Sequence, residues 1–214
     1  SYISLSDGNF AIPMATSQDH KRIYDNDMGP NTGGMGAYSP TPIINESMAK
    51  KIQEKIIDKT IDSMKSEGTP FKGFLYAGVM IKDGEPYVLE FNVRMGDPEC
   101  QPIIMRMDSD LYAYLMASTE GTLSSLPPVD WKNQSAVCIV LASKGYPEAY
   151  PKNEEITGLG FSSEGAFVFH AGTKRENGKV LTNGGRVLGV TALGNSLEQA
   201  ISVAYSAANK INWP

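Results

Sequence analysis

Two oxygen-bearing side chains interrupt an apolar segment near the middle of the chain. Residues 86–92 read PYVLEFN, a pattern typical of a strand, with Glu90 and Asn92 two positions apart. Side chains alternate between the faces of a strand, so these two point the same way, with their Cα atoms about 6.6 Å apart. Carboxylate and carboxamide oxygens are ligands that Mg²⁺ or Mn²⁺ prefers. The spacing therefore predicts one divalent cation held by Glu90 and Asn92.

The residues that follow this pair extend the prediction. If the strand continues, Arg94 falls on the same face, where a guanidinium beside a metal could stabilise a transferring phosphoryl group. A strand with one polar face in solvent is the alternative, and it produces the same pattern. Val88, which strict alternation places on the polar face, and the dense segment MGDPE argue against that alternative. The apolar residues of the segment are typical of a buried strand: Tyr87, Val88, Leu89, Phe91 and Val93.

A second segment with chemical potential is rich in glycine. Residues 29–36 contain four glycines and match neither GxxxxGK[ST] nor GxGxxG. Glycines at this density allow positive φ and a close approach of the backbone to a ligand, and their N–H groups can bind an anion. A mobile surface loop is the alternative, although the length of the loop favours function. The candidate substrate-binding residues here are Asp19, Lys21, Arg22, Asn31, Thr32, Gly33 and Gly34.

The elements that must position these residues follow from pattern. Residues 2–15 predict two short strands around a turn at Asp7-Gly8, and residues 74–92 predict a hairpin with its turn at Asp83-Gly84. Residues 45–66 predict the clearest helix, capped by Asn45 and ended by Gly68. A second helix is expected from Asp108 or Ser109 to about Ser118. Residues 16–44 show no periodicity and are expected to form a long polar loop.

The composition changes in the second half of the chain. Residues 119–134 are typical of a linker, and strands are expected at 135–143, 166–172 and 186–194. A final helix is expected after Ser196, which can form a capping box with Gln199. Two mixed units, residues 1–126 and 127–214, are the simplest organisation.

Composition and charge exclude several classes of protein. The chain has 214 residues, 41% of them hydrophobic, and a formal net charge of −5. We therefore expect a packed core and neither nucleic acid nor a membrane as partner. Two cysteines are too few for a disulfide framework or a zinc knuckle. Together these features predict a cytoplasmic protein.

Six segments, in order along the chain, resemble the phosphoribosylamine–glycine ligase family of ATP-grasp enzymes. They are SQDHKR (17–22), GPNTGGMGAYSP (29–40), LEFNVRMGDPECQP (89–102), VLASKGYP (140–147), HAGT (170–173) and TNGGRVL (182–188). The resemblance departs from the family's RxGDPE signature only in an apolar exchange at Met95. It implies an α+β fold, namely the core part of an ATP-grasp domain (antiparallel sheet with helices) at 1–126, followed by a small mixed α/β C-terminal domain at 127–214.

The resemblance also implies an activity. Enzymes of this family join glycine to 5-phosphoribosylamine with ATP in de novo purine biosynthesis, through glycyl phosphate, giving glycinamide ribonucleotide, ADP and phosphate. It implies Glu90 and Asn92 as ligands of Mg²⁺ or Mn²⁺, and Asp97 as a further substrate-binding residue. It also implies a fragment that lacks the N-terminal part of the enzyme and is inactive alone.

Two alternatives stay open: a noncatalytic fragment of that enzyme, and another ATP-grasp carboxylate–amine ligase. His170 and the turn at 183–186 are expected to be structural. In that turn, positive φ is expected at the glycines, and Arg186 is expected to contact the first domain.

Overall fold

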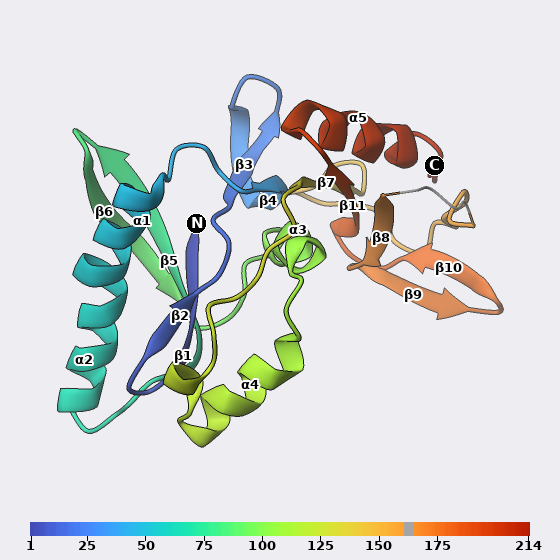
Figure 1. Cartoon of the computed structure of the whole chain (residues 1–214). Helices are drawn as coiled ribbons and strands as arrows, with labels where there is room; N and C mark the ends of the chain where they lie inside the picture. The colour runs from blue at the N-terminus through green and yellow to red at the C-terminus, as the bar shows by residue number, and fades with distance from the viewer. Residues whose placement is uncertain (161–164) are drawn as a thin grey trace. The chain divides into compact units, whose positions relative to one another are not determined.

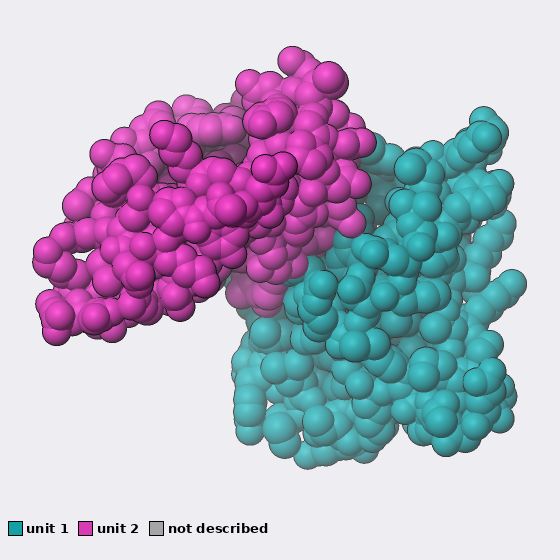
Figure 2. Space-filling model, turned by 180° about the vertical axis from the view of Figure 1, so that it is seen from behind, with its two compact units in different colours: residues 1–17, 40–96, 107–132 teal, residues 18–39, 97–106, 133–214 magenta. Residues whose placement is uncertain are grey.

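The computed structural model describes residues 1–160 and 165–214. These residues form two compact units, which Figure 2 shows in different colours. Unit 1 consists of residues 1–17, 40–96 and 107–132, and unit 2 of residues 18–39, 97–106 and 133–214. The compact units alternate along the chain, whereas the division into domains at residue 127 follows chain order and stays a prediction.

Unit 1 is built on a four-stranded antiparallel sheet. Its strands, in the order β2-β1-β5-β6, are β2 (Ala11–Pro13), β1 (Tyr2–Asp7), β5 (Lys72–Lys82) and β6 (Glu85–Asn92) (Figure 1). The turn after β1 is closed by Asp7 Oδ1, which accepts hydrogen bonds from the backbone N–H groups of Asn9 and Phe10. Asp83 and Gly84 both have positive φ, as a two-residue hairpin turn requires. Both predicted turns are confirmed.

One long helix covers a face of this sheet. It comprises α1 (Glu46–Ile52), the π-helical turn η1 (Gln53–Ile57) and α2 (Asp58–Ser66), and Asn45 Oδ1 caps it by accepting from Met48 N at 2.9 Å. The predicted helix at 45–66 is therefore confirmed. The buried cluster between helix and sheet consists of Tyr2, Ala11, Ile52, Ile56, Ile57, Ile61, Leu75 and Ala77.

The π-helical turn was not predicted, and its first residue, Gln53, lies at the centre of a partly buried polar cluster. Gln53 Oε1 accepts from the Tyr2 hydroxyl at 3.2 Å and from the Ser4 hydroxyl at 3.4 Å. Gln53 Nε2 donates to Asp58 Oδ1 at 2.7 Å and to the Ala11 carbonyl at 3.3 Å. Burial, with Asp58 nearby, raises the pKa of Tyr2 to about 12, so its hydroxyl stays a donor. The wider turn lets one glutamine satisfy all four groups.

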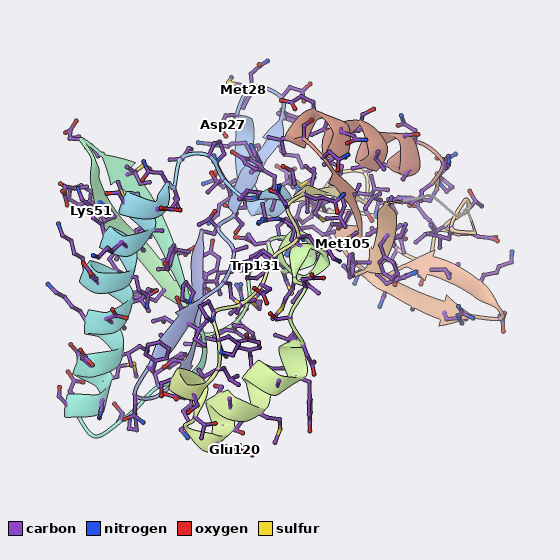
Figure 3. All side chains as sticks on the ribbon, viewed as in Figure 1. Asp27, Met28, Lys51, Met105, Glu120 and Trp131 are labelled. Atoms are coloured by element: carbon purple, nitrogen blue, oxygen red, sulfur yellow. The ribbon has the colours of Figure 1, made fainter. Side chains whose placement is uncertain are left out.

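Charged pairs join this helix to the start of β6. Lys51, labelled in Figure 3, and Lys55 contact the Glu85 carboxylate at 2.8 Å and 2.7 Å. These hydrogen bonds lower the pKa of Glu85 to about 2. They tie the beginning of the strand that carries the candidate metal ligands to a rigid helix.

The second predicted helix begins later than expected. α4 spans Leu111–Glu120, and Asp110 is its cap because its carboxylate accepts from Tyr112 N at 3.0 Å. Gly121 ends the helix with φ of 80°. A short 3₁₀ turn, η2 (Leu123–Ser125), follows.

Unit 2 contains a five-stranded antiparallel sheet in the order β3-β4-β7-β11-β8. The strands are β3 (Gln18–Tyr24), β4 (Met28–Ser39), β7 (Ser135–Ala142), β11 (Arg186–Gly194) and β8 (Ala166–His170). The strands expected at 135–143, 166–172 and 186–194 are thus confirmed. A separate hairpin, β9 (Thr173–Glu176) with β10 (Lys179–Thr182), was not predicted.

The prediction of a loop at 16–44 is wrong. β3 and β4 form a hairpin with Asp27 and Met28 near its tip (Figure 3), and β4 also pairs with β7. Glycine lowers the strand signal of β4, but pairing with β7, in which Ala37 is opposite Cys138, overrides that local preference.

Helices complete unit 2. α3 (Cys100–Arg106) was not predicted, and α5 (Leu197–Ala208) was. Ser196 Oγ accepts from Gln199 N at 3.2 Å as predicted, but Gln199 Oε1 accepts from Asn195 N instead of completing the box at Ser196. The buried cluster beneath α5 contains Ile156, Val187, Leu188, Val190, Ala207, Ala208 and Ile211.

Among the described residues, no helix is long and apolar enough to cross a membrane.

Candidate functional site

The candidate metal ligands lie on one face of β6. Glu90 is opposite Gly78 in the ladder with β5, and Asn92 is opposite Tyr76. A Cβ atom at Gly78 would stand 3.0 Å from Glu90 Cγ, tighter than ordinary contact. The glycine therefore leaves room for the Glu90 side chain, and the two oxygen donors have the arrangement that their spacing predicts.

A bulge in β6 changes the face on which Val88 lies. The register shifts so that Val88 is opposite Val79 while Glu90 is opposite Gly78, which makes Leu89 an extra residue. Val88 and Phe91 line a hollow beside the long helix, together with residues such as Ile56. The interpretation that Val88 shares the polar face is therefore wrong, because strict alternation does not hold across a bulge.

The apolar residues of this segment are exposed, contrary to the prediction of a buried strand. β6 is an edge strand with a partner on one side only. The exposed fractions are 55% for Tyr87, 40% for Val88, 65% for Leu89, 46% for Phe91 and 73% for Val93. Large apolar side chains gathered on one edge are typical of a surface that another polypeptide segment covers.

Arg94 contacts one of the two candidate ligands. Its Nη2 donates to Asn92 Oδ1 at 3.3 Å, and its Nη1 donates to the Met95 carbonyl at 3.0 Å. Asn92 Oδ1 is the atom that would bind a cation, and here it already accepts a hydrogen bond from the Arg94 guanidinium. Within residues 1–160 and 165–214, no group of three or more His, Cys, Asp or Glu side chains could hold a metal. A cation at Glu90 and Asn92 would take its other ligands from water or phosphate.

The Gly-rich segment forms a bulge in β4. Asn31 is opposite Arg22 and Gly36 is opposite His20, so residues 32–35 face Lys21 alone. The Thr32 hydroxyl supports this bulge, because it donates to the Lys21 carbonyl at 2.8 Å and accepts from Gly34 N at 3.0 Å. The extra residues interrupt the ladder with β3 and bend the strand.

The two glycines of the bulge have different environments. Gly33 is exposed, and its N–H donates to the Tyr146 hydroxyl at 3.2 Å. Gly34 is buried with φ of 118°, and a Cβ there would stand 2.5 Å from Pro98 Cδ. Arg186 Nη1 donates to the carbonyls of Gly33 and Gly34 at 3.0 Å and 3.2 Å. These contacts favour an ordered bulge over a mobile loop.

Asp97 joins the same cluster. Its Oδ2 accepts from Arg186 Nη2 at 3.0 Å, and its Oδ1 accepts from Gln101 Nε2 at 3.0 Å. The Asp97 carbonyl also accepts from Arg186 Nη1 at 2.7 Å. Arg186 therefore contacts residues of the predicted first domain, as expected.

The turn before Arg186 differs from its prediction. The structure assigns positive φ to neither Gly184 nor Gly185, so that part of the prediction is wrong. Close approach explains the glycines instead, since a Cβ at Gly185 would stand 2.2 Å from Tyr146 Cδ2.

The charged residues of β3 have different environments in unit 2. Burial, with Glu99 nearby, raises the pKa of the Asp19 carboxyl. Glu99 is itself buried, with 2% of its surface exposed. Arg22 Nη1 donates to the Gly29 carbonyl and closes the hairpin, while Lys21 is exposed.

The candidate residues thus fall into two sets. Glu90, Asn92 and Arg94 lie together in unit 1. The residues predicted to bind substrate lie in unit 2: Asp19, Lys21, Arg22, Asn31, Thr32, Gly33, Gly34 and Asp97. Sequence reasoning gave a structural role to Arg186, which contacts three residues of this second set.

Two family models match the chain. Residues 1–100 match the ATP-grasp (A) domain of phosphoribosylglycinamide synthetase, and residues 136–214 match the C domain of the same enzyme. The chain belongs to the phosphoribosylglycinamide synthetase family. The predicted α+β fold, with an antiparallel ATP-grasp sheet followed by the smaller domain, is confirmed by these matches.

Members of the phosphoribosylglycinamide synthetase family resemble the chain along its full length. A phosphoribosylamine–glycine ligase of Vibrio parahaemolyticus is 52% identical over 100% of this chain and 50% of its own length. A chloroplastic phosphoribosylamine–glycine ligase of Arabidopsis thaliana is 50% identical over 100% of this chain and 41% of its own. The crystal structure of the Thermotoga maritima phosphoribosylamine–glycine ligase superposes with a TM-score of 0.89 at 39% identity, over 99% of this chain and 52% of that chain. The chain spans about half the length of the curated relatives it matches.

Proposed function

We propose that this chain is the catalytic core part of a phosphoribosylamine–glycine ligase. The proposed reaction joins glycine to 5-phosphoribosylamine at the expense of ATP, through glycyl phosphate, and releases ADP and phosphate. The observation that carries the proposal is the oxygen-donor pair Glu90 and Asn92, on one face of β6 opposite Gly78, in a chain of this family.

The donor set fits a hard divalent cation. A carboxylate and a carboxamide oxygen suit Mg²⁺ or Mn²⁺. Because Gly78 has no Cβ, the Glu90 side chain has room to lie beside it. Such a cation, when bound with ATP, would neutralise developing phosphoryl charge. Arg94, which is hydrogen-bonded to Asn92, is placed to leave that contact and donate to a phosphoryl oxygen.

The Gly-rich bulge at residues 32–35 is proposed to bind glycine or 5-phosphoribosylamine, not ATP. Gly33 is exposed, and its N–H donates to the Tyr146 hydroxyl, which a carboxylate or phosphate oxygen of a substrate could replace. Asn31 adds a side-chain donor, and Thr32 supports the bulge through its hydrogen bond to the Lys21 carbonyl. Asp19, Lys21, Arg22 and Asp97 belong to the same unit and are the further proposed substrate-binding residues. Gly34 serves this site indirectly, because it is buried against Pro98.

The remaining half of the enzyme is the proposed partner. The curated relatives are about twice as long as this chain, and β6 exposes large apolar side chains along its edge. We assign that edge to contact with the segments that complete the ATP site, and we place the enzyme in the cytoplasm. The proposal includes no nucleic acid and no membrane partner.

An assay of ADP release tests the proposal. The full-length ligase that contains this chain should release ADP only when glycine and 5-phosphoribosylamine are both present with ATP and a divalent cation. The 214-residue chain alone should release none, because the segments expected to hold the adenosine and to position ATP against glycine belong to the rest of the enzyme. ADP release by the full-length ligase with a different amine acceptor would point to another carboxylate–amine ligase. ADP release by the chain alone at nearly the rate of the full-length ligase would contradict the proposal that the rest of the enzyme is required.

A further inference from the structure

The Arg186 side chain joins the Gly-rich bulge to the loop before α3. It reaches the carbonyls of Gly33, Gly34 and Asp97 from Nη1 and the Asp97 carboxylate from Nη2, at distances between 2.7 and 3.2 Å. Only 22% of the side chain is exposed. All of these residues belong to unit 2, although 153 positions separate Gly33 from Arg186 in sequence.

Backbone contacts with Ser143, Gly172 and Asn183, all in the second half of the chain, hold Arg186 in this position. Its carbonyl accepts from Gly172 N at 2.9 Å, and the Gly172 carbonyl accepts from Asn183 N at 2.7 Å. Ser143 N donates to the Gly185 carbonyl at 2.8 Å, and the Ser143 hydroxyl donates to the Gly184 carbonyl at 2.9 Å. The turn that precedes Arg186 is therefore fixed on both sides by hydrogen bonds.

Tyr146 adds a second support from the same region. Its ring lies where a Cβ at Gly185 would collide with it, and its hydroxyl accepts from Gly33 N. In this structure the Tyr146 hydroxyl therefore occupies the Gly33 N–H that a substrate oxygen would take, while Arg186 holds the carbonyls of the bulge.

We propose that Arg186 is a positioning residue for the ligase reaction. It fixes the bulge at residues 32–35 against Asp97, so that the exposed backbone of Gly33 meets an anionic oxygen of a substrate other than ATP. That oxygen belongs to the carboxylate of glycine or the phosphate of 5-phosphoribosylamine, which share this chemistry. The inference rests on the proposed function and adds to it a residue that lies in the C domain.

The chemistry of arginine suits this task better than that of lysine. A planar guanidinium offers N–H donors from two adjacent nitrogens, which can serve a carboxylate and backbone carbonyls in one plane. A lysine ammonium is a single point with three donors, and it would not span the same acceptors. Arg186→Lys should therefore lose most of the alignment while it keeps the charge.

The first experiment measures alignment without activity. Hydrogen–deuterium exchange is followed in the 214-residue chain for wild type, Arg186→Lys and Arg186→Met. The amides of Gly33 and Gly34 should exchange faster in both variants, while those of the buried strand β7 stay unchanged. The control is Arg175→Met, which removes an exposed arginine of β9. Unchanged exchange at Gly33 and Gly34 in Arg186→Met would overturn the positioning role, whether or not the ligase is active.

The second experiment measures the consequence for substrates. In the full-length ligase, Arg186→Lys and Arg186→Met should raise the KM for glycine or for 5-phosphoribosylamine by about tenfold to a hundredfold. The KM for ATP of both Arg186 variants should equal that of the Arg175→Met control. Glycine and 5-phosphoribosylamine are titrated separately, so the substrate whose KM rises identifies the oxygen that is held. Unchanged KM values for both glycine and 5-phosphoribosylamine in Arg186→Met would overturn the proposal.

Discussion

Gly78 of β5 lies directly opposite Glu90 of β6, and a Cβ at position 78 would stand 3.0 Å from Glu90 Cγ. The glycine is therefore part of the arrangement of Glu90, since a larger residue would push the carboxylate away from the Asn92 oxygen. The bulge at Leu89 contributes to the same end, because it moves Val88 to the other face and leaves the polar face to Glu90 and Asn92.

Gly78→Ala should weaken metal binding more than it weakens the fold. We expect the concentration of Mg²⁺ needed for half-maximal ligase activity to rise by about tenfold, as for other residues that orient metal ligands. Gly160→Ala is the matched control, because a Cβ at that exposed glycine meets nothing within 4 Å. An unchanged metal requirement in Gly78→Ala would show that Glu90 does not depend on this space.

The two glycines of the bulge should respond differently to alanine. Gly34→Ala should lower the free energy of unfolding of this chain by about 1–3 kcal/mol, because φ is 118° and Pro98 is close. Gly33→Ala should cost less stability, since φ is not positive there, but its Cβ would stand 3.1 Å from Arg186 Cζ and press on the guanidinium, so it should raise the KM for glycine or 5-phosphoribosylamine. Chemical denaturation and steady-state kinetics separate the two outcomes. Equal stability losses in both variants would argue for a purely structural turn.

Asp19→Asn should change stability in a way that depends on pH. Burial, with Glu99 nearby, raises the folded-state pKa of Asp19 above its ordinary value of 3.8, so the folded chain binds the proton more tightly than the unfolded chain. Its contribution to stability is present below that ordinary value and is lost as pH rises through the raised pKa.

The stability of Asp19→Asn relative to wild type should therefore increase as pH rises above 3.8 and level off beyond the raised pKa. Denaturant unfolding between about pH 3 and about pH 7 checks this, with the exposed Asp62→Asn as control. A difference that is constant across this range would contradict the assigned environment of Asp19.

Short-range sequence patterns predicted the elements whose structure depends on residues close together in the chain. The cap at Asn45, the apolar stripe of the long helix and the Asp83-Gly84 turn all follow from short-range chemistry, and the structure contains each of them. The pair Glu90 and Asn92 could be placed on one face by spacing alone.

Features that depend on distant residues could not be predicted in this way. The strand β4 exists because β3 and β7 pair with it, in spite of four glycines that weaken any strand pattern. The bulge at Leu89 leaves no mark in the sequence, and it reverses the side on which Val88 lies. Arg186 joins segments far apart along the chain, so only the fold reveals what its side chain contacts.

The most direct test of the account is a metal titration of Glu90→Gln and Asn92→Leu in the full-length ligase. ADP release is measured with glycine and 5-phosphoribosylamine while Mg²⁺ or Mn²⁺ is varied, and thermal unfolding confirms that both variants fold. We predict that each variant needs far more metal or loses turnover, because a lost ligand removes several kcal/mol of transition-state stabilisation, on the order of that expected for metal-ion catalysis. Wild-type metal dependence in both variants would contradict the assignment of Glu90 and Asn92 as the metal ligands.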